Sequence, residues 1–214
     1  MVREVVIIGS GGHAKVIIDI LKGAAEYKPV GFTDPASGQK EIMGVPLLGD
    51  DSVLPSLYKK GLKYAFVAVG ENRLRADLAR LVIELGFELI NAVSSHSYVS
   101  EWAALGRGIA IMPGAIVNPY ANIGDHAIIN TGATIDHDCV IESCCHVAPG
   151  CHVAGNVRIG TGTLLGIGST VIPKTTIGAW SIIGAGTVVT GDLPEYAVAR
   201  GVPARVINKL SAET

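Results

Sequence analysis

The side chains best suited to chemistry cluster in one short stretch of the sequence. The segment "HDCVIESCCHVAPGCH", residues 137–152, holds three of the chain's six histidines and all four of its cysteines. Cysteine and histidine are the ligands that zinc prefers, paired thiols can carry redox chemistry, and a histidine beside a carboxylate can act as a base. The elements that position these residues decide among the three readings.

A six-residue repeat governs the chain from about residue 93 onward. Every sixth residue from Leu105 to Val189 is Ile, Val or Leu, at fifteen consecutive positions, and a second register two positions earlier holds mostly small residues from Ala115 to Thr187. A period of six is typical of a solenoid in which each repeat forms one short strand and one turn. With three repeats per coil, the pattern predicts a parallel β-helix of about five triangular coils.

The repeat gives the cysteines a structural interpretation. Cys139, Cys145 and Cys151 occupy the small-residue register that Ala133 fills one repeat earlier. Structural zinc sites usually space cysteines two to four residues apart, whereas a spacing of six on a triangular coil sends them to three different walls. We interpret them as buried thiols that pack as small hydrophobic residues, with a zinc site or a redox pair as the alternatives. Cys144 lies outside the register and is expected at a turn, with no assigned role.

The histidines lie outside the inward register, so we expect them at corners or on the surface. His137 is followed directly by Asp138, and imidazole titrates near neutral pH while a neighbouring carboxylate can fix its tautomer. Adjacent residues on a flat strand point to opposite faces, so this pair needs a turn or an interface to meet. His126 and His152 are interpreted as ordinary surface residues.

The first part of the chain follows a different pattern. "REVVIIG" and "YAFVAVG" have the apolar runs of buried strands, while "HAKVIIDILKG" and "NRLRADLARLVIELG" have helical spacing that ends at glycine. Alternating strands and helices predict a small Rossmann-like α/β domain. We therefore expect an α/β domain over 1–92, a β-helix over 93–190 and a C-terminal tail over 191–214.

A glycine-rich loop follows the first predicted strand. "GSGGHA", residues 9–14, precedes a helix, and Asp34 lies twenty residues beyond Ala14. Backbone amides at a helix N-terminus attract phosphate, and the same pattern resembles a dinucleotide fingerprint. A full NAD fold needs more strands than this segment supplies, and a tight turn without a ligand is the other alternative.

Composition limits the classes of partner that the chain is expected to bind. Only 17% of residues are charged and the net charge is −2, so neither nucleic acid nor an anionic membrane surface is expected as a partner. No run approaches the roughly 20 apolar residues needed to span a bilayer. We expect a cytoplasmic protein with reduced thiols.

Three segments resemble the NeuD/PglD family of sugar O- and N-acyltransferases, over essentially the whole chain. They are "GSGGHAK", "NTGATIDHDCVIESCCHVAPGCHVAGNV" and "GVPARVI". The resemblance implies a left-handed β-helix, a homotrimer, and acetyl-CoA bound between neighbouring subunits, with no metal. The left hand comes from the resemblance alone, because ordinary parallel crossovers are right-handed.

The resemblance also implies roles for individual residues. His137 matches the general base, and Asp138 matches the acidic residue that raises its basicity. The remaining matches are a substrate-side position (Asn130), acetyl-CoA contacts (His146, the Gly155 amide, Ile167 and Ala185) and a nucleotide-sugar pocket (Gly11, Gly12, His13, Asp34 and Gly70).

The implied activity is N-acetylation of the 4-amino group of a UDP-, GDP- or dTDP-linked deoxy sugar, by direct attack on acetyl-CoA. An acyl-cysteine intermediate is disfavoured because the lattice cysteines should be buried. Two alternatives are a sialic-acid-type O-acetyltransferase and a non-catalytic trimeric scaffold. A zinc hydrolase would need three converging histidines, yet His137, His146 and His152 are offset by nine and six residues where one coil is eighteen.

Overall fold

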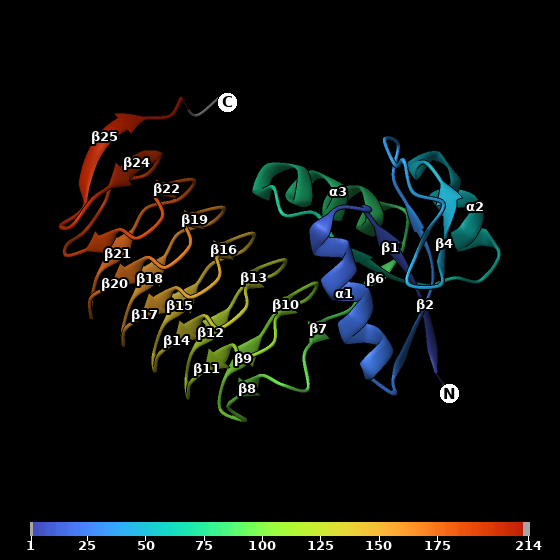
Figure 1. Ribbon diagram of the computed structural model, residues 1–214, viewed down its shortest axis with the longest axis horizontal. Helices are drawn as coiled ribbons and strands as arrows, with labels where there is room; N and C mark the ends of the chain where they lie inside the picture. Colours follow the sequence, from blue (N-terminus) through green and yellow to red (C-terminus); the bar gives the residue numbers. More distant parts are fainter. Residues whose placement is uncertain (1, 212–214) are drawn as a thin grey trace. The chain divides into compact units, whose positions relative to one another are not determined.

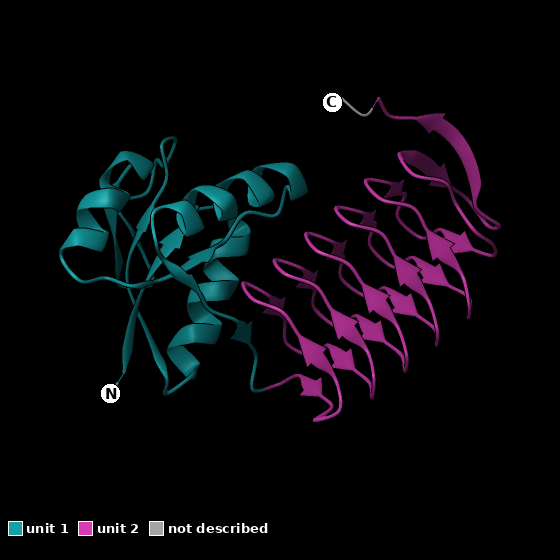
Figure 2. Cartoon of the chain, turned by 180° about the vertical axis from the view of Figure 1, so that it is seen from behind, with its two compact units in different colours: residues 1–95 teal, residues 96–214 magenta. Residues whose placement is uncertain are grey.

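The computed structural model describes residues 2–211, so the last three residues of the expected tail lie outside the described part. The chain forms two compact units, residues 1–95 and 96–214 (Figure 2). No helix among residues 2–211 combines the length and the apolar character that crossing a membrane requires.

The first unit is a mostly parallel sheet with helices (Figure 1). The strand order is β3-β4-β2-β1-β5-β6, and only the β3–β4 pair is antiparallel. The strands are β1 (Arg3–Ile8), β2 (Tyr27–Thr33), β3 (Glu41–Ile42), β4 (Val45–Gly49), β5 (Tyr64–Val67) and β6 (Glu88–Leu89). The helices are α1 (Gly12–Gly23), the 3₁₀ turn η1 (Asp51–Val53), α2 (Leu54–Lys59) and α3 (Asn72–Glu84), and β7 (Ala92–Val93) follows.

Burial explains why these segments adopt these elements. The apolar run Val5–Ile8 is buried throughout, as expected of a central parallel strand. Helix α1 buries Ile17, Ile18 and Leu21, which lie on one face at helical spacing. The predicted α/β architecture is therefore correct.

The second unit is a left-handed parallel β-helix whose short strands stack in three walls (Figure 1). The first wall contains β10 (Ala110–Ile111), β13 (Ile128–Ile129), β16 (His146–Val147), β19 (Leu164–Leu165) and β22 (Ile182–Ile183). The second contains β8 (Tyr98–Val99), β11 (Ile116–Val117), β14 (Thr134–Ile135), β17 (His152–Val153), β20 (Thr170–Val171) and β23 (Val188–Val189). The third contains β9 (Ala104–Leu105), β12 (Asn122–Ile123), β15 (Val140–Ile141), β18 (Arg158–Ile159) and β21 (Thr176–Ile177).

The six-residue register positions every one of these strands. The fifteen predicted aliphatic residues, Leu105 to Val189, are the second residues of β9 to β23. Fourteen of them are buried and Leu105 is half-buried, so the predicted interior is confirmed. Successive coils pair in register with an offset of 18 residues, as Thr134 does with His152.

The cysteines pack as the repeat predicts. Cys139, Cys145 and Cys151 are free and 0% exposed, and each Sγ lies 3.1 Å from a backbone carbonyl oxygen one coil later. Burial raises the pKa of the Cys139 and Cys151 thiols. Cys144 sits in a turn with φ of 58°, where its side chain is 6% exposed.

The end of the chain extends the β-helix. Strand β24 (Ala197–Arg200) pairs in parallel with β22, and β25 (Arg205–Lys209) pairs antiparallel with β24. Two strands of the first wall therefore lie within the segment expected as a tail, residues 191–214.

Candidate active site

His137 and Asp138 form a hydrogen-bonded pair in the turn that follows β14. The Asp138 carboxylate lies 2.7 Å from Nδ1 of His137. The two neighbours meet because Asp138 adopts a left-handed conformation, with φ of 58°, which turns its side chain back toward the ring. Both side chains are about half exposed, at 54% and 50%. The pair therefore stands at a solvent-accessible corner between the second and third walls.

The electrostatics of this corner suit a base. The hydrogen bond to Asp138 raises the pKa of His137 most, desolvation opposes that rise, and the charges of Asp136 and Asp138 add to it. A carboxylate on Nδ1 favours the tautomer with the proton there. The lone pair of the neutral ring then lies on Nε2, where it can accept a proton.

Gly155 lies one coil beyond His137, directly against its ring. A Cβ built on Gly155 would lie 2.6 Å from Nε2 and 2.7 Å from Cε1 of His137. Gly155 is buried, and its amide donates no hydrogen bond to any group within residues 2–211. A free amide thus lies next to the nitrogen that can accept a proton.

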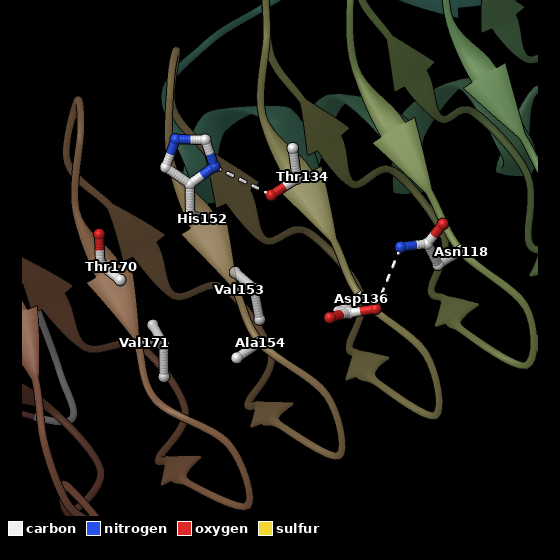
Figure 3. A pocket seen from close by; sticks show the side chains of 8 residues that line it. All are labelled: Asn118, Thr134, Asp136, His152, Val153, Ala154, Thr170 and Val171. Carbon is white, nitrogen blue, oxygen red and sulfur yellow. Dashed lines mark hydrogen bonds between the residues drawn. The ribbon is translucent and has the colours of Figure 1, made fainter.

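Asp136 and Asn118, which were not selected from the sequence, are hydrogen-bonded to the turn that carries His137. One oxygen of Asp136 accepts hydrogen bonds from the His137 amide at 2.8 Å and from Nδ2 of Asn118 at 3.0 Å. Asn118 and Asp136 are 18 residues apart, so the coil length could have identified them as stacked neighbours. Asn118 and Asp136 also line a hollow of about 250 Å³ on the second wall. In the same hollow, His152 Nδ1 lies 3.0 Å from the Thr134 hydroxyl (Figure 3).

A second group of candidate residues lies at a different corner. Nδ2 of Asn130 is 3.0 Å from Nε2 of His146, and Oδ1 of Asn130 accepts a hydrogen bond from the Thr131 amide at 2.8 Å. Ile167, with 62% of its side chain exposed, and the exposed Ala185 occupy turns of the same corner, between the first and second walls. The structure therefore brings Asn130 and His146 together and places them on another edge of the coil from His137 and Gly155.

The geometry of residues 137–152 does not support a zinc site there. His146 pairs in register with Ile128 and Leu164, and His152 with Thr134 and Thr170, so neither stacks on another histidine. Within residues 2–211, no group of three or more His, Cys, Asp or Glu side chains is arranged to hold a metal ion.

The glycine-rich loop of the first unit is tied to Asp34. One carboxylate oxygen of Asp34 accepts hydrogen bonds from the Ser10 amide at 2.9 Å and the Ser10 hydroxyl at 2.7 Å, and the other accepts from the Ala36 amide at 2.8 Å. Although desolvation works in the opposite direction, these hydrogen bonds lower the pKa of Asp34. Its carboxylate thus holds the loop, a contact that the sequence analysis did not identify.

The other candidate residues of the first unit lie just beyond the C-terminal ends of β1 and β5. Gly11 and Gly12 are exposed at the start of α1, and His13 is half-buried in its first turn. Gly70 follows β5 by three residues, and its carbonyl accepts a hydrogen bond from the buried Arg75 at 3.0 Å. Arg75 is a further residue that the sequence analysis missed, and it anchors the loop after β5.

Comparison with protein families matches both halves of the chain. Residues 4–82 match the PglD N-terminal domain, and residues 156–191 match the bacterial transferase hexapeptide model of six repeats. A curated relative, an uncharacterised protein of Acanthamoeba polyphaga mimivirus, is 34% identical over 105 residues, and the match spans only 20% of its length.

Solved structures resemble the chain over nearly its whole length. A mutant of perosamine N-acetyltransferase from Caulobacter crescentus, in complex with CoA and GDP-perosamine, is 45% identical, with a TM-score of 0.93 and coverage of 98% of this chain and 99% of that one. The acetyltransferase domain of PglB from Neisseria gonorrhoeae, in complex with acetyl coenzyme A, is 34% identical, with a TM-score of 0.91 and coverage of 97% and 100%. The chain belongs to the NeuD/PglD family of hexapeptide-repeat sugar acyltransferases.

Proposed function

We propose that the protein transfers the acetyl group of acetyl-CoA to the amino group of a nucleotide-linked 4-amino-deoxy sugar. The observation that carries the proposal is the His137–Asp138 pair, a half-exposed imidazole whose Nδ1 is held at 2.7 Å by a carboxylate. Similarity to an enzyme crystallised with CoA and GDP-perosamine supports this substrate class and makes a GDP-linked sugar the first to test.

In the proposed reaction, His137 acts as the general base. Nε2 takes a proton from the neutral sugar amine as its nitrogen attacks the thioester carbonyl, so that a C–N bond forms and the C–S bond breaks. Asp138 stabilises the resulting imidazolium, which then returns the proton to the departing CoA thiolate. The Gly155 amide is proposed to donate a hydrogen bond to the carbonyl oxygen as negative charge develops there.

We propose that each active site lies between two subunits of a homotrimer. Asn130, His146, Ile167 and Ala185 occupy one corner of the coil, while His137 and Gly155 occupy the next. Two corners of one chain cannot converge on one small substrate, but corners of neighbouring chains can meet in a symmetric assembly. Acetyl-CoA would then run along the exposed Ile167 and Ala185 of one chain toward His137 of its neighbour.

The first unit is proposed to bind the nucleotide part of the acceptor. Gly11, Gly12 and His13 begin α1, where backbone amides and the helix dipole favour phosphate. Asp34 is proposed to act mainly by fixing the loop through Ser10, since its oxygens already accept three hydrogen bonds. Residues 1–92 and 93–190 are accordingly proposed as the acceptor-binding and acetyl-transfer domains.

The test is a substrate panel read out by CoA thiol release. GDP-, UDP- and dTDP-linked 4-amino sugars and sialic acid are each incubated with acetyl-CoA and the full-length protein. Transfer to an amino sugar with a product resistant to hydroxylamine, as an amide is, supports the proposal. A hydroxylamine-labile ester would identify an O-acetyltransferase instead, and no transfer together with no thermal stabilisation by millimolar acetyl-CoA would favour a scaffold.

A further inference from the structure

Gly155 is set apart from most other turn glycines by its backbone. At Gly150, Gly168 and Gly186 the φ angles are 65°, 67° and 65°, a left-handed conformation that by itself requires glycine. Gly155 has no such angle, so an L-residue could adopt its backbone without strain. The conformation of the turn therefore does not explain why this position lacks a side chain.

The space next to Gly155 supplies the explanation. The three nearest atoms to a Cβ at this position are Nε2, Cε1 and Nδ1 of His137, at 2.6, 2.7 and 3.2 Å. All three belong to one imidazole, and the shortest distance is to Nε2. The ring thus lies directly beside Gly155 and occupies the volume that a side chain would fill.

We propose that Gly155 is a positioning residue for His137, which holds the imidazole between its own backbone and the Asp138 carboxylate. Asp138 fixes the ring at Nδ1, and Gly155 provides the surface against which the ring rests. Together the two contacts set the direction of Nε2. That this direction matters for acetyl transfer rests on the proposed function. That Gly155 and Asp138 together hold the ring, an arrangement we call the seat of His137, is a claim about the structure alone.

The substitution Gly155→Ala tests this directly, because the fold should tolerate it. The three atoms nearest to the added methyl group all belong to one half-exposed side chain, which can rotate toward solvent. Rotation would separate Nδ1 from Asp138 and misdirect Nε2, and a displacement of about 1 Å at a reacting group can cost about 100-fold in rate. The amide of residue 155, the proposed donor to the thioester oxygen, is retained in alanine.

A matched control lies at the same corner. Gly191 also follows a second-wall strand by two residues, two coils further on, and a Cβ there would meet no atom within 4 Å. Gly191→Ala should therefore change neither His137 nor the rate. Gly108 and Gly162 are unsuitable controls, since their φ angles of 66° and 69° would add backbone strain.

Two readouts separate the seat from the proposed reaction. In the first, NMR titration of His137 in the full-length protein should give a lower pKa in Gly155→Ala than in the native protein and Gly191→Ala, because the Asp138 hydrogen bond is lost. In the second, kcat for acetyl transfer should fall at least tenfold with little change in KM for acetyl-CoA. An unchanged His137 pKa in Gly155→Ala would overturn the positioning role.

The combination of results also tests the base assignment. A lowered His137 pKa with unchanged kcat would uphold the seat and overturn the role of His137 as base. Adding Gly155→Ala to a His137→Ala background should cost no further activity or thermal stability, because the methyl group then fills vacated space. A further loss of rate in that background would contradict the claim that Gly155 acts through the ring.

Discussion

Asp138 reaches back to its own sequence neighbour, so that its carboxylate holds Nδ1 of His137 at 2.7 Å. This contact depends on the left-handed conformation of Asp138 in a turn of the β-helix. A carboxylate at Nδ1 leaves Nε2 as the nitrogen that can take up a proton.

Asp138→Asn should alter the pH dependence of acetyl transfer. The hydrogen bond to Asp138 raises the pKa of His137, so its loss should let His137 lose its proton at lower pH. In the proposed reaction the neutral ring is the active form, so the acidic limb of kcat/KM should move to lower pH. The plateau should fall, because no carboxylate then stabilises the imidazolium. Asparagine tolerates left-handed φ, so the turn should persist. An unmoved acidic limb would argue against the pair as the base.

Subunits that carry a substitution at different corners of the β-helix should complement one another. His137→Ala and His146→Ala should each be poorly active alone. In the proposed homotrimer, random mixing of the two variants should restore about a quarter of native activity, since that share of interfaces combines both intact residues. The measurement is acetyl transfer after co-refolding or co-expression of the two variants. Absence of any recovery would place both histidines in the site of a single chain.

The lattice cysteines should be dispensable for the chemistry. The triple variant Cys139→Ala, Cys145→Ala, Cys151→Ala should keep kcat within about twofold, because no covalent step passes through a thiol in the direct mechanism. Each substitution leaves a small cavity, so the free energy of unfolding should fall by about 1 kcal/mol per site. In the native protein these thiols should react with a disulfide reagent only after denaturation. Loss of activity in a folded triple variant would revive the acyl-cysteine mechanism.

Asp34→Ala should destabilise the first unit in a pH-dependent way. The hydrogen bonds from Ser10 and Ala36 lower the pKa of Asp34 in the folded protein. A group with a lowered folded pKa contributes stability above its unfolded pKa, and that contribution is lost as the pH falls through the folded pKa. Urea unfolding at pH 7 should show a loss of about 1–2 kcal/mol, which shrinks in acid. A loss that is equal at both pH values would show that the carboxylate charge does not hold the loop.

The sequence predicted the β-helix almost residue by residue, because its period directly encodes which side chains face inward. The coil length of 18 residues follows from the same period, and it could have placed Gly155 beside His137 and Asn118 beside Asp136. The direction of the Asp138 side chain could not be predicted, because it depends on a left-handed φ. That conformation is only one of several that an aspartate can adopt. The Ser10–Asp34 contact joins residues 24 apart with no repeat to relate them.

The most direct test of the account is the effect of His137→Ala on acetyl transfer to a GDP-linked 4-amino sugar. The imidazole is half exposed, so its removal should leave thermal stability and the oligomeric state unchanged. The kcat should fall by about 100-fold or more, as expected when a general base is removed. A folded His137→Ala protein that transfers acetyl groups at the native rate would contradict the role of His137 as base.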